Sequence, residues 1–227
     1  MSGTRTRGAR TPHRLAAHPQ ADHVQEGHPM TVGIIGAGAI ASALALRFAA
    51  AGQAVTISNS RGPHTLTAHA SRLGFQVAAG TVQEAAASEF VVLAVPWRSA
   101  PDALAGVSDW SGRILIDTTN PLGPPDFRVA DLGGRPSTSV IADMVPGAAV
   151  VKAFNTLPPA VLAEDPRHSG GRRVIFLSGD DAVTNKRVQR LVEGAGWAVI
   201  DLGSLHLGGR LQQFPGGVLP TLDLALR

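Results

Sequence analysis

The stretch Thr31-Val32-Gly33-Ile34-Ile35-Gly36-Ala37-Gly38-Ala39-Ile40-Ala41 decides the fold. Its first five residues form an apolar run of strand length, and the residues after Gly38 are rich in alanine and leucine, which favours a helix. A glycine turn between a strand and a helix lets backbone N–H groups approach a pyrophosphate. A bare structural turn is the alternative, but the flanking strand and helix favour a cofactor loop. We expect its contacts at Gly36, Ala37, Gly38, Ala39 and Ile40, with Ala41 in place of a third glycine.

Short apolar runs alternate with longer amphipathic stretches along the rest of the chain, which predicts strand–helix–strand units and a parallel sheet. The expected strands are Thr31–Ile35, Ala54–Ser58, Phe75–Ala79, Phe90–Val95, Arg113–Asp117, Ala149–Phe154, Arg173–Ser178 and Ala198–Asp201. The expected helices are 39–51, 64–73, 81–88, 98–106, 138–145 and 181–195. The pattern therefore predicts an α/β fold of the Rossmann type, with a doubly wound, mostly parallel sheet and a short C-terminal extension. Residues 30–227 form one domain in this interpretation, and Leu122–Pro136 is a loop long enough to cover a ligand.

The end of the second expected strand indicates which dinucleotide binds. NAD-binding sites place an acidic residue about 20 residues after the glycines to hold the ribose 2′-hydroxyl. No Asp or Glu occurs between Thr31 and Gln83, and Asn59, Ser60 and Arg61 follow the strand instead. An arginine suits a 2′-phosphate, which a carboxylate would repel. A solvated arginine in a turn is the plainer alternative, but the missing acid favours NADP(H).

Two further strand ends predict the nicotinamide side of the site. The fourth strand leads into Ala94, Val95 and Pro96, and the fifth leads to Asn120. Ligands of open parallel sheets lie beyond the carboxyl ends of the strands. We therefore expect these residues to flank the nicotinamide and its ribose, although a strand-ending proline and an Asn-Pro turn explain them equally well one at a time.

The sixth strand carries the predicted second-substrate contacts at its end, Asn155 and Thr156. Lys152 lies within this apolar strand, which indicates either an edge strand or a polar site. Asp180 and Asp181 precede a helix and are expected to cap it rather than to catalyse. The segment 201–206 is a second candidate lining for the substrate pocket. No catalytic acid or base is identified, which suits hydride transfer, since the cofactor supplies the reactive atom.

Composition excludes several classes of function. The chain has 227 residues and no cysteine, which rules out disulfides and thiolate metal sites. No apolar run reaches the ~18 residues of a membrane span, so we expect a soluble, cytoplasmic protein.

The formal net charge of the chain is +3, and residues 1–29 contribute +2 of it. Because so little net charge is left on the domain, no nucleic-acid surface is expected there. Residues 1–29 are expected to be a disordered tail. The regularly spaced histidines of this tail are interpreted as accidental, and no metal site is expected: His13, His18, His23 and His28.

Several motifs in order resemble the coenzyme F-420-dependent NADP oxidoreductase family. They are residues 33–38, 59–63, 94–96, 152–156 and 201–205, so the resemblance spans about residues 31–210. It implies that Ser60 and Arg61 bind the 2′-phosphate, that the nicotinamide stacks near Pro96, and that hydride passes to or from the deazaflavin F-420. The departure is Ala37 and Ala41, because F-420:NADP reductases usually carry Gly-Gly-Thr-Gly-x-x-Gly.

The leading hypothesis is thus an NADPH-dependent oxidoreductase with coenzyme F-420 as its second substrate. NADPH-dependent reduction of a flavin, ferric iron or a small organic molecule is the alternative within the same chemistry, since relatives with this domain reduce flavin, iron or small imines. A non-catalytic NADP(H) redox sensor is the alternative outside it. The apolar ending 214–226 suits a homodimer contact or a lid. The alanine- and arginine-rich composition suits a bacterial source.

Overall fold

The computed structural model describes residues 30–123, 127–168 and 170–227. The strands are β1 (Thr31–Ile35), β2 (Ala54–Ser58), β3 (Val77–Gly80), β4 (Phe90–Leu93), β5 (Ile114–Asp117), β6 (Ala149–Ala153), β7 (Arg167–His168), β8 (Gly171–Gly179), β9 (Ala198–Asp201) and β10 (Ala225–Leu226). The α-helices are α1 (Ala39–Ala50), α2 (Thr67–Leu73), α3 (Val82–Ala86), α4 (Ala100–Ala105), α5 (Ser137–Asp143), α6 (Pro159–Ala163), α7 (Ala182–Gly194) and α8 (Gly208–Gln212). Two short 3₁₀ helices, η1 (Pro63–Thr65) and η2 (Trp97–Ser99), precede α2 and α4. The expected tail, residues 1–29, lies outside the described residues.

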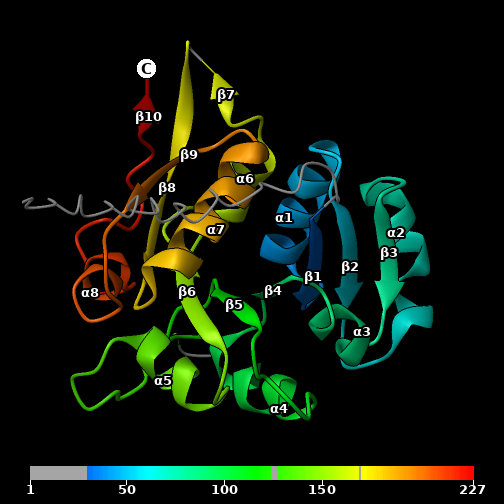
Figure 1. The fold of residues 1–227 in the computed structure, drawn as a ribbon, viewed down its shortest axis with the longest axis horizontal. Coiled ribbons are helices and arrows are strands. Elements are labelled where there is room, and N and C mark those ends of the chain that lie inside the picture. Colours follow the sequence, from blue (N-terminus) through cyan, green and yellow to red (C-terminus); the bar gives the residue numbers. More distant parts are fainter. Residues whose placement is uncertain (1–29, 124–126, 169) are drawn as a thin grey trace, which may run out of the picture.

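The strands form one sheet with the order β10-β8-β6-β5-β4-β1-β2-β3, and β7 and β9 also pair with β8 (Figure 1). The strands from β3 to β6 all pair in parallel, whereas β8 runs antiparallel to β6. The order reverses between β1 and β4, as in doubly wound dinucleotide-binding sheets. The expected α/β fold of the Rossmann type is confirmed.

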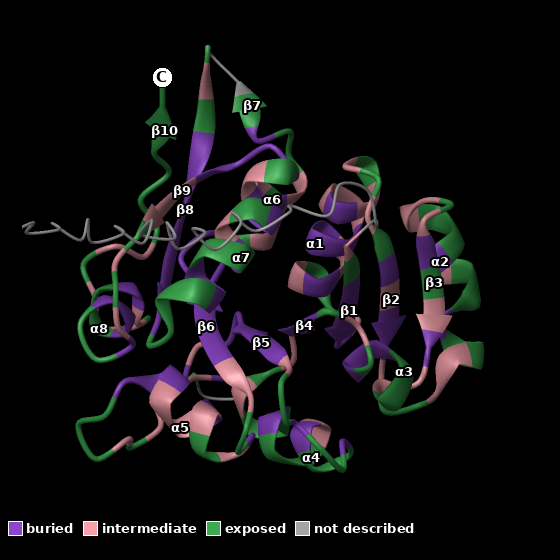
Figure 2. Cartoon of the chain, in the orientation of Figure 1, coloured by how far each residue is buried: buried purple, intermediate pink, exposed green. Residues whose placement is uncertain are grey.

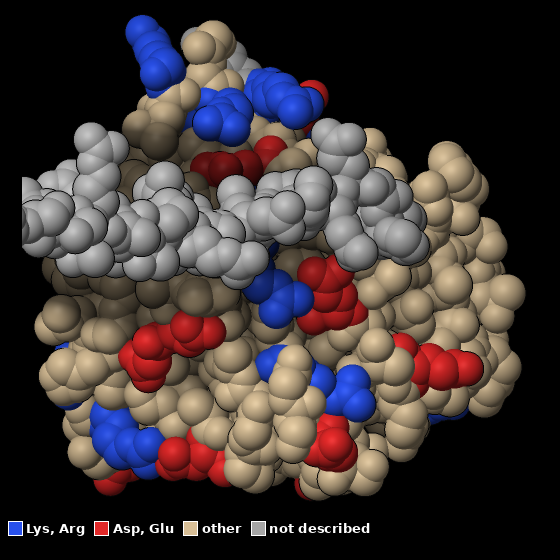
Figure 3. Space-filling model, in the orientation of Figure 1, with Lys and Arg blue, Asp and Glu red and all other residues tan. Residues whose placement is uncertain are grey.

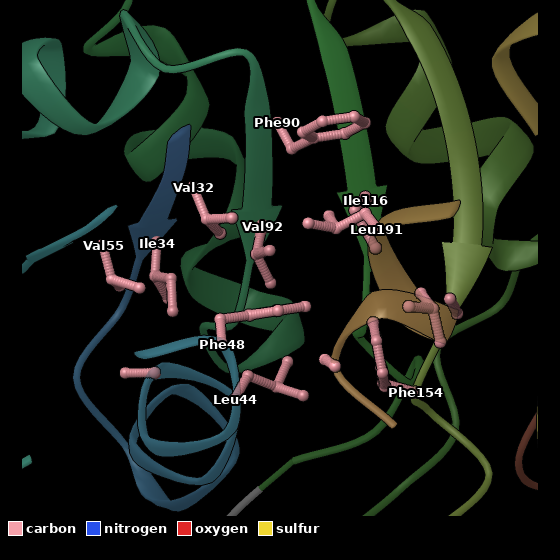
Figure 4. Close-up of a cluster of buried hydrophobic side chains, with 14 of the residues drawn as sticks. Val32, Ile34, Leu44, Phe48, Val55, Phe90, Val92, Ile116, Phe154 and Leu191 are labelled. Carbon is pink, nitrogen blue, oxygen red and sulfur yellow. The ribbon is translucent and has the colours of Figure 1, made fainter. Parts of the chain in front are cut away.

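Helices cover both faces of the sheet, so the central strands β4 and β5 are buried throughout (Figure 2). One apolar cluster joins the sheet to α1, α2, α6 and α7, and a second joins it to α3, α4 and α5. In the first cluster Phe48, Phe154 and Leu191 meet from α1, the end of β6 and α7 (Figure 4). Phe154 has a left-handed backbone, with φ of 63°, and its ring lies edge-on to Phe48 and Trp197 at 6.1 and 5.4 Å. This packing holds the strained turn that follows β6.

The structure differs from the expected elements mainly at their ends. Phe75 is 96% exposed and precedes β3, and β4 ends at Leu93 rather than Val95. The expected helix 64–73 is divided into η1 and α2. The elements α6, α8, β7 and β10 were not expected, because each has five residues or fewer and is too short to show a period. In the described part of Leu122–Pro136 no helix or strand forms, as expected for a loop.

Lys152 lies in β6, which pairs with β5 and β8, so the expectation of an edge position is wrong. Its ammonium is fully buried, lies 3.1 Å from Oδ2 of Asp117 and donates to the carbonyl of Thr119 at 2.8 Å. Asp117 also accepts from Thr138 and, through Oδ1, from the backbone and hydroxyl of Thr119. Burial lowers the pKa of Lys152, while the Asp117 carboxylate beside it raises it. The alternative expectation, a polar site, corresponds to this ion pair, which fixes the turn after β5.

Replacing Lys152 by Met is expected to destabilise the protein by about 3–5 kcal/mol, because it leaves the buried Asp117 carboxylate without a counter-charge. The double variant Asp117→Asn with Lys152→Met removes both charges and keeps an acceptor for the backbone of Thr119. It is expected to regain most of the loss. Urea unfolding followed by circular dichroism measures both. If the single variant were as stable as the parent protein, the ion pair would not hold the turn.

Candidate functional site

The glycine turn between β1 and α1 brings three strands together at one edge of the sheet. The N–H of Gly36 donates to the carbonyl of Ser58 at 3.0 Å, which ties the turn to the end of β2. Gly36 has φ of 127°, and a Cβ at this position would lie 2.1 Å from the carbonyl oxygen of Ala94. Only glycine allows both the backbone conformation and this approach to the chain after β4. The turn therefore lies at the point where strand order reverses.

Gly38 is the N-cap of α1 and faces open space. A Cβ at Gly38 would meet no protein atom within 4 Å, and its φ of −81° suits any residue. Neither a side-chain cap nor an acidic residue occurs in the first turn of α1. The first N–H groups of a helix lack intrahelical partners and carry partial positive charge. This helix start is therefore open to an anionic group.

A cavity of about 610 Å³ lies at this helix start, between the ends of β1, β2 and β4, the start of α3 and one face of α4. The expected site residues that line it are Gly36, Ala37, Gly38, Asn59, Ser60, Ala94, Val95 and Pro96. Ala39, Ile40, Arg61 and Asn120 are not in its lining. Ala39 and Ile40 form the first turn of α1, where Ala39 is exposed and Ile40 half-buried.

The cavity also has lining residues that the sequence interpretation missed. Thr81, Val82 and Gln83 follow the end of β3, so the rule of strand ends that identified Asn59 applies to them as well. Ser99, Asp102, Ala103 and Gly106 have the spacing of one helix face, which lies along α4. A helical face turned to solvent and one turned to a ligand look alike in a single sequence.

The loop after β2 is held by its own side chains. Oδ1 of Asn59 accepts the backbone N–H of Arg61 at 2.9 Å, and Nδ2 of Asn59 donates to Thr65 at 3.0 Å. Ser60 and Arg61 are exposed at the tip of this turn, beside the cavity, and the guanidinium of Arg61 pairs with no acidic residue in the described ranges. Asn59 thus supports the turn, and Ser60 and Arg61 are left as donors.

At the ends of β5 and β6, Asn120 and Asn155 bond to each other. Nδ2 of Asn155 donates to Oδ1 of Asn120 at 3.0 Å, and Nδ2 of Asn120 donates to the carbonyl of Asn155 at 3.1 Å. Asn155 and Thr156, expected as substrate contacts, are only 5% and 4% exposed. The carbonyl of Thr156 accepts from Thr221 in the C-terminal segment. The structure therefore brings Asn120 and Asn155 together, with Asn120 nearer the surface.

Asp181 caps α7, because its carboxylate accepts from the backbone of Val183 and Thr184, as expected. Asp180 instead accepts from the backbone of Leu205 at 2.8 Å. Asp201, from the second candidate lining, binds Asn185 and the backbone of Gly203. These acids therefore serve local structure.

No group of three or more His, Cys, Asp or Glu side chains in residues 30–123, 127–168 and 170–227 is placed to hold a metal ion. None of the helices there is long and apolar enough to cross a membrane. On the face drawn in Figure 3, Lys and Arg are interspersed with Asp and Glu. The four tail histidines lie outside the described residues.

A second cavity, of about 640 Å³, lies between α4, α5 and the loop after β5. Its lining includes Trp97, Pro101 and Met144 from the helices and Leu122 and Leu132 from the loop. The long loop thus contributes to a cavity next to the one at the glycine turn.

Comparison with known proteins places this site in a family. The family profile described as "NADP oxidoreductase coenzyme F420-dependent" matches residues 31–121, from the glycine turn to just past Asn120. A structure from Arthrobacter sp. FB24, described as a candidate F420-dependent NADP-reductase, is 30% identical, with a TM-score of 0.65 over 79% of this chain and 86% of that one. The chain belongs to the F420-dependent NADP oxidoreductase family. It is an NADP-dependent oxidoreductase.

Two further similar proteins match the chain beyond residue 121. A hypothetical protein of Sinorhizobium meliloti is 47% identical, with a TM-score of 0.83 over 88% of this chain and 97% of that one. The rat metalloreductase STEAP3 is 27% identical over 84% of this chain. The chain spans 37% of the length of that relative. The likeness to these proteins thus includes the C-terminal half, beyond the part matched by the family profile.

Alanine substitutions at the two loop glycines of this oxidoreductase are expected to differ in their effect on stability. Gly36→Ala should destabilise it by roughly 2–4 kcal/mol, because it adds backbone strain and forces the turn away from Ala94. Gly38→Ala should cost at most about 1 kcal/mol, the usual range for an N-cap. Thermal unfolding of both variants measures the difference. Equal losses would show that the close approach at Gly36 does not constrain the turn.

Proposed function

We propose that the cavity at the glycine turn binds NADP(H), with the pyrophosphate at the start of α1 and the 2′-phosphate at Ser60 and Arg61. The open helix start at Gly38, where an added Cβ would meet no protein atom, is the observation that carries this proposal. The exposed guanidinium of Arg61 beside the cavity supports the second contact. Asn59 contributes indirectly, by holding the turn that presents both residues.

The nicotinamide end of the cofactor is proposed to lie at Pro96 and Asn120. Ala94, Val95 and Pro96 line the cavity on the side of β4, and Pro96 offers a flat apolar surface. Asn120 follows the neighbouring strand β5, beyond the lining of the cavity. The bound nicotinamide supplies or accepts a hydride, while the chain binds it, orients its ring and limits water around it. Asn155 and Thr156 support this end from within the protein.

Coenzyme F-420 is our proposal for the second substrate. The description of the family profile and that of the Arthrobacter structure both contain this coenzyme. Ala37 lies in the glycine turn and Ala41 in the first turn of α1, both on the proposed dinucleotide side of the site, so these departures do not argue against a deazaflavin partner. In this proposal a hydride passes between the nicotinamide and the deazaflavin. Its direction depends on the relative concentrations of the oxidised and reduced forms of the two coenzymes.

Reduction of a metal ion or a flavin is the second candidate. The rat relative is named a metalloreductase, and its likeness covers most of this chain. Within the described residues no side-chain cluster suits a bound metal, so ferric iron would act as a substrate that approaches the nicotinamide end. A small organic molecule is a further acceptor within this second candidate, since it would also be reduced by NADPH. Family membership favours these reductases over a redox sensor without catalysis.

The proposed function also bears on the location and the partners of the protein. We infer a cytoplasmic, bacterial enzyme that acts on small molecules rather than on nucleic acid. The exposed apolar side chains near the C-terminus support a homodimer contact: Phe214, Val218, Leu222, Leu224 and Leu226.

Arg61→Ala is expected to weaken NADPH binding by roughly 1.5–3 kcal/mol, the value of a charge-assisted hydrogen bond, and to leave NADH almost unaffected. Gly38→Ala is the matched comparison. Its methyl group lies at the proposed pyrophosphate position, which both cofactors share, so it should weaken both. Isothermal titration calorimetry measures the four affinities. Equal losses of NADPH and NADH in the arginine variant would contradict the 2′-phosphate assignment.

The second substrate is tested by absorbance of NADPH in separate reactions with F-420, FMN and ferric citrate. The proposal predicts rapid oxidation of NADPH with F-420 and slow or no oxidation with the other two. Turnover on ferric citrate or FMN alone would favour the second candidate. Tight NADPH binding without turnover on any of the three would contradict the F-420, flavin and ferric iron proposals, and would favour a small organic acceptor or a redox sensor.

A further inference from the structure

The amides of Asn120 and Asn155 bond to each other, and Asn155 bonds in turn to Gln212 in the C-terminal segment, closely through the backbone carbonyl of Gln212 and at 3.5 Å through its side-chain Nε2. Nδ2 of Asn155 donates to the backbone carbonyl of Gln212 at 2.7 Å and to Oδ1 of Asn120 at 3.0 Å. Gln212 ends α8 and is fully buried, although its helix lies at the edge of the molecule in Figure 1. Its side chain bonds to β8, where Nε2 donates to the carbonyl of Phe176 at 3.0 Å and Oε1 accepts from Ser178 at 2.6 Å.

Backbone carbonyls fix the orientation of each amide in this chain. A carbonyl oxygen only accepts hydrogen bonds, so the group that faces it must be an amide nitrogen. Asn120 faces the carbonyl of Asn155, Asn155 faces that of Gln212, and Gln212 faces that of Phe176. No member can rotate by half a turn without placing two acceptors against each other. The chain of amides therefore has one arrangement.

This arrangement determines what Asn120 can offer to a ligand. Both hydrogens of the Asn155 amide are used, one on Gln212 and one on Asn120, so its nitrogen has none left for a substrate. Asn120 donates one hydrogen to Asn155 and accepts one at Oδ1. Asn120 is half-buried and retains one N–H and one lone pair. A ribose hydroxyl or a carboxamide needs donors and acceptors of this kind.

We propose that Gln212 is a positioning residue for the hydride-transfer site, and that it acts through Asn155 to hold Asn120 in a single orientation toward the nicotinamide half of NADPH. This inference rests on the proposed function, which places that half at Asn120. It makes the C-terminal segment part of the cofactor site, although Gln212 does not line the cavity at the glycine turn. Gln212 itself touches neither cofactor nor substrate.

The adjacent residue, Gln213, provides a matched control. It belongs to the same segment and is half-buried, and its Oε1 accepts the backbone N–H of Ser137 at 2.9 Å. It thus anchors the end of α8 to α5. Replacement of either glutamine by Met keeps the side-chain volume and removes the hydrogen bonds of that side chain. Only Gln212→Met removes the bonds to Phe176 and Ser178 that hold the backbone carbonyl of residue 212 in place for Asn155.

The test compares the binding of NADPH and of 2′,5′-ADP, which carries the 2′-phosphate but no nicotinamide. Calorimetry on Gln212→Met should show NADPH weakened roughly tenfold, the effect of about one hydrogen bond, and 2′,5′-ADP changed less than about twofold. The fluorescence of bound NADPH at saturation should also change, because it reports on the surroundings of the nicotinamide. Gln213→Met should alter neither. Thermal unfolding shows whether each variant is folded.

Unchanged NADPH affinity and fluorescence in Gln212→Met would overturn the proposal, as would equal weakening of NADPH and 2′,5′-ADP. If Gln212→Met does not fold, Ser178→Ala removes one anchor of Gln212 with a smaller change. It should weaken NADPH about threefold and leave 2′,5′-ADP unchanged, and no change in NADPH would again overturn the proposal. Failure of the parent protein to bind 2′,5′-ADP would count against the proposed 2′-phosphate site, which separates that failure from a failure of the amide chain.

Discussion

The approach of the Gly36 backbone to the chain after β4 is the constraint on which the site depends. A side chain at Gly36 would overlap the carbonyl of Ala94, so the two segments meet only because a hydrogen stands there. Their contact closes the edge of the sheet at the switch point and leaves the start of α1 facing the cavity. The same turn is tied to β2 through the carbonyl of Ser58. One residue without a side chain thus sets the relative positions of the glycine turn, the proposed phosphate loop and the proposed nicotinamide wall.

Much of this half of the molecule could be predicted from the sequence, because its signals are local. The β1 run, the glycine turn and the absence of an acid up to Gln83 are all contained in one stretch. The strands of this stretch, β1, β2 and β3, lie side by side in the sheet in the order in which they occur in the chain. Eight strands were expected near their observed positions for the same reason. The α4 lining was missed because an i, i+3, i+4, i+7 face does not reveal what it faces.

The other half depended on contacts between residues distant in sequence, which a single sequence does not show. Lys152 had two interpretations because the residues around it form an apolar strand in either case. The local sequence does not show whether the lysine lies in an edge strand or beside a buried carboxylate. Asp117, 35 positions away, decides between them. Asn155 was expected to face a substrate, yet its donors are used by Asn120 and Gln212, the latter 57 positions away. Polar residues at a strand end indicate that something binds them, but not whether it is a ligand or another part of the chain.

The two halves of the site therefore differ in how they are held. Backbone geometry holds the glycine turn, where the conformation of Gly36 and its approach to Ala94 leave no room for a side chain. Side-chain chemistry holds the proposed nicotinamide side, where the Asp117–Lys152 pair fixes the turn before Asn120 and the amides fix its orientation. A buried ion pair and buried amides tolerate few arrangements, since any unpaired member would be costly. The C-terminal segment is required for the second kind of order, because Gln212 joins β8 to Asn155 where β6 no longer pairs with that strand.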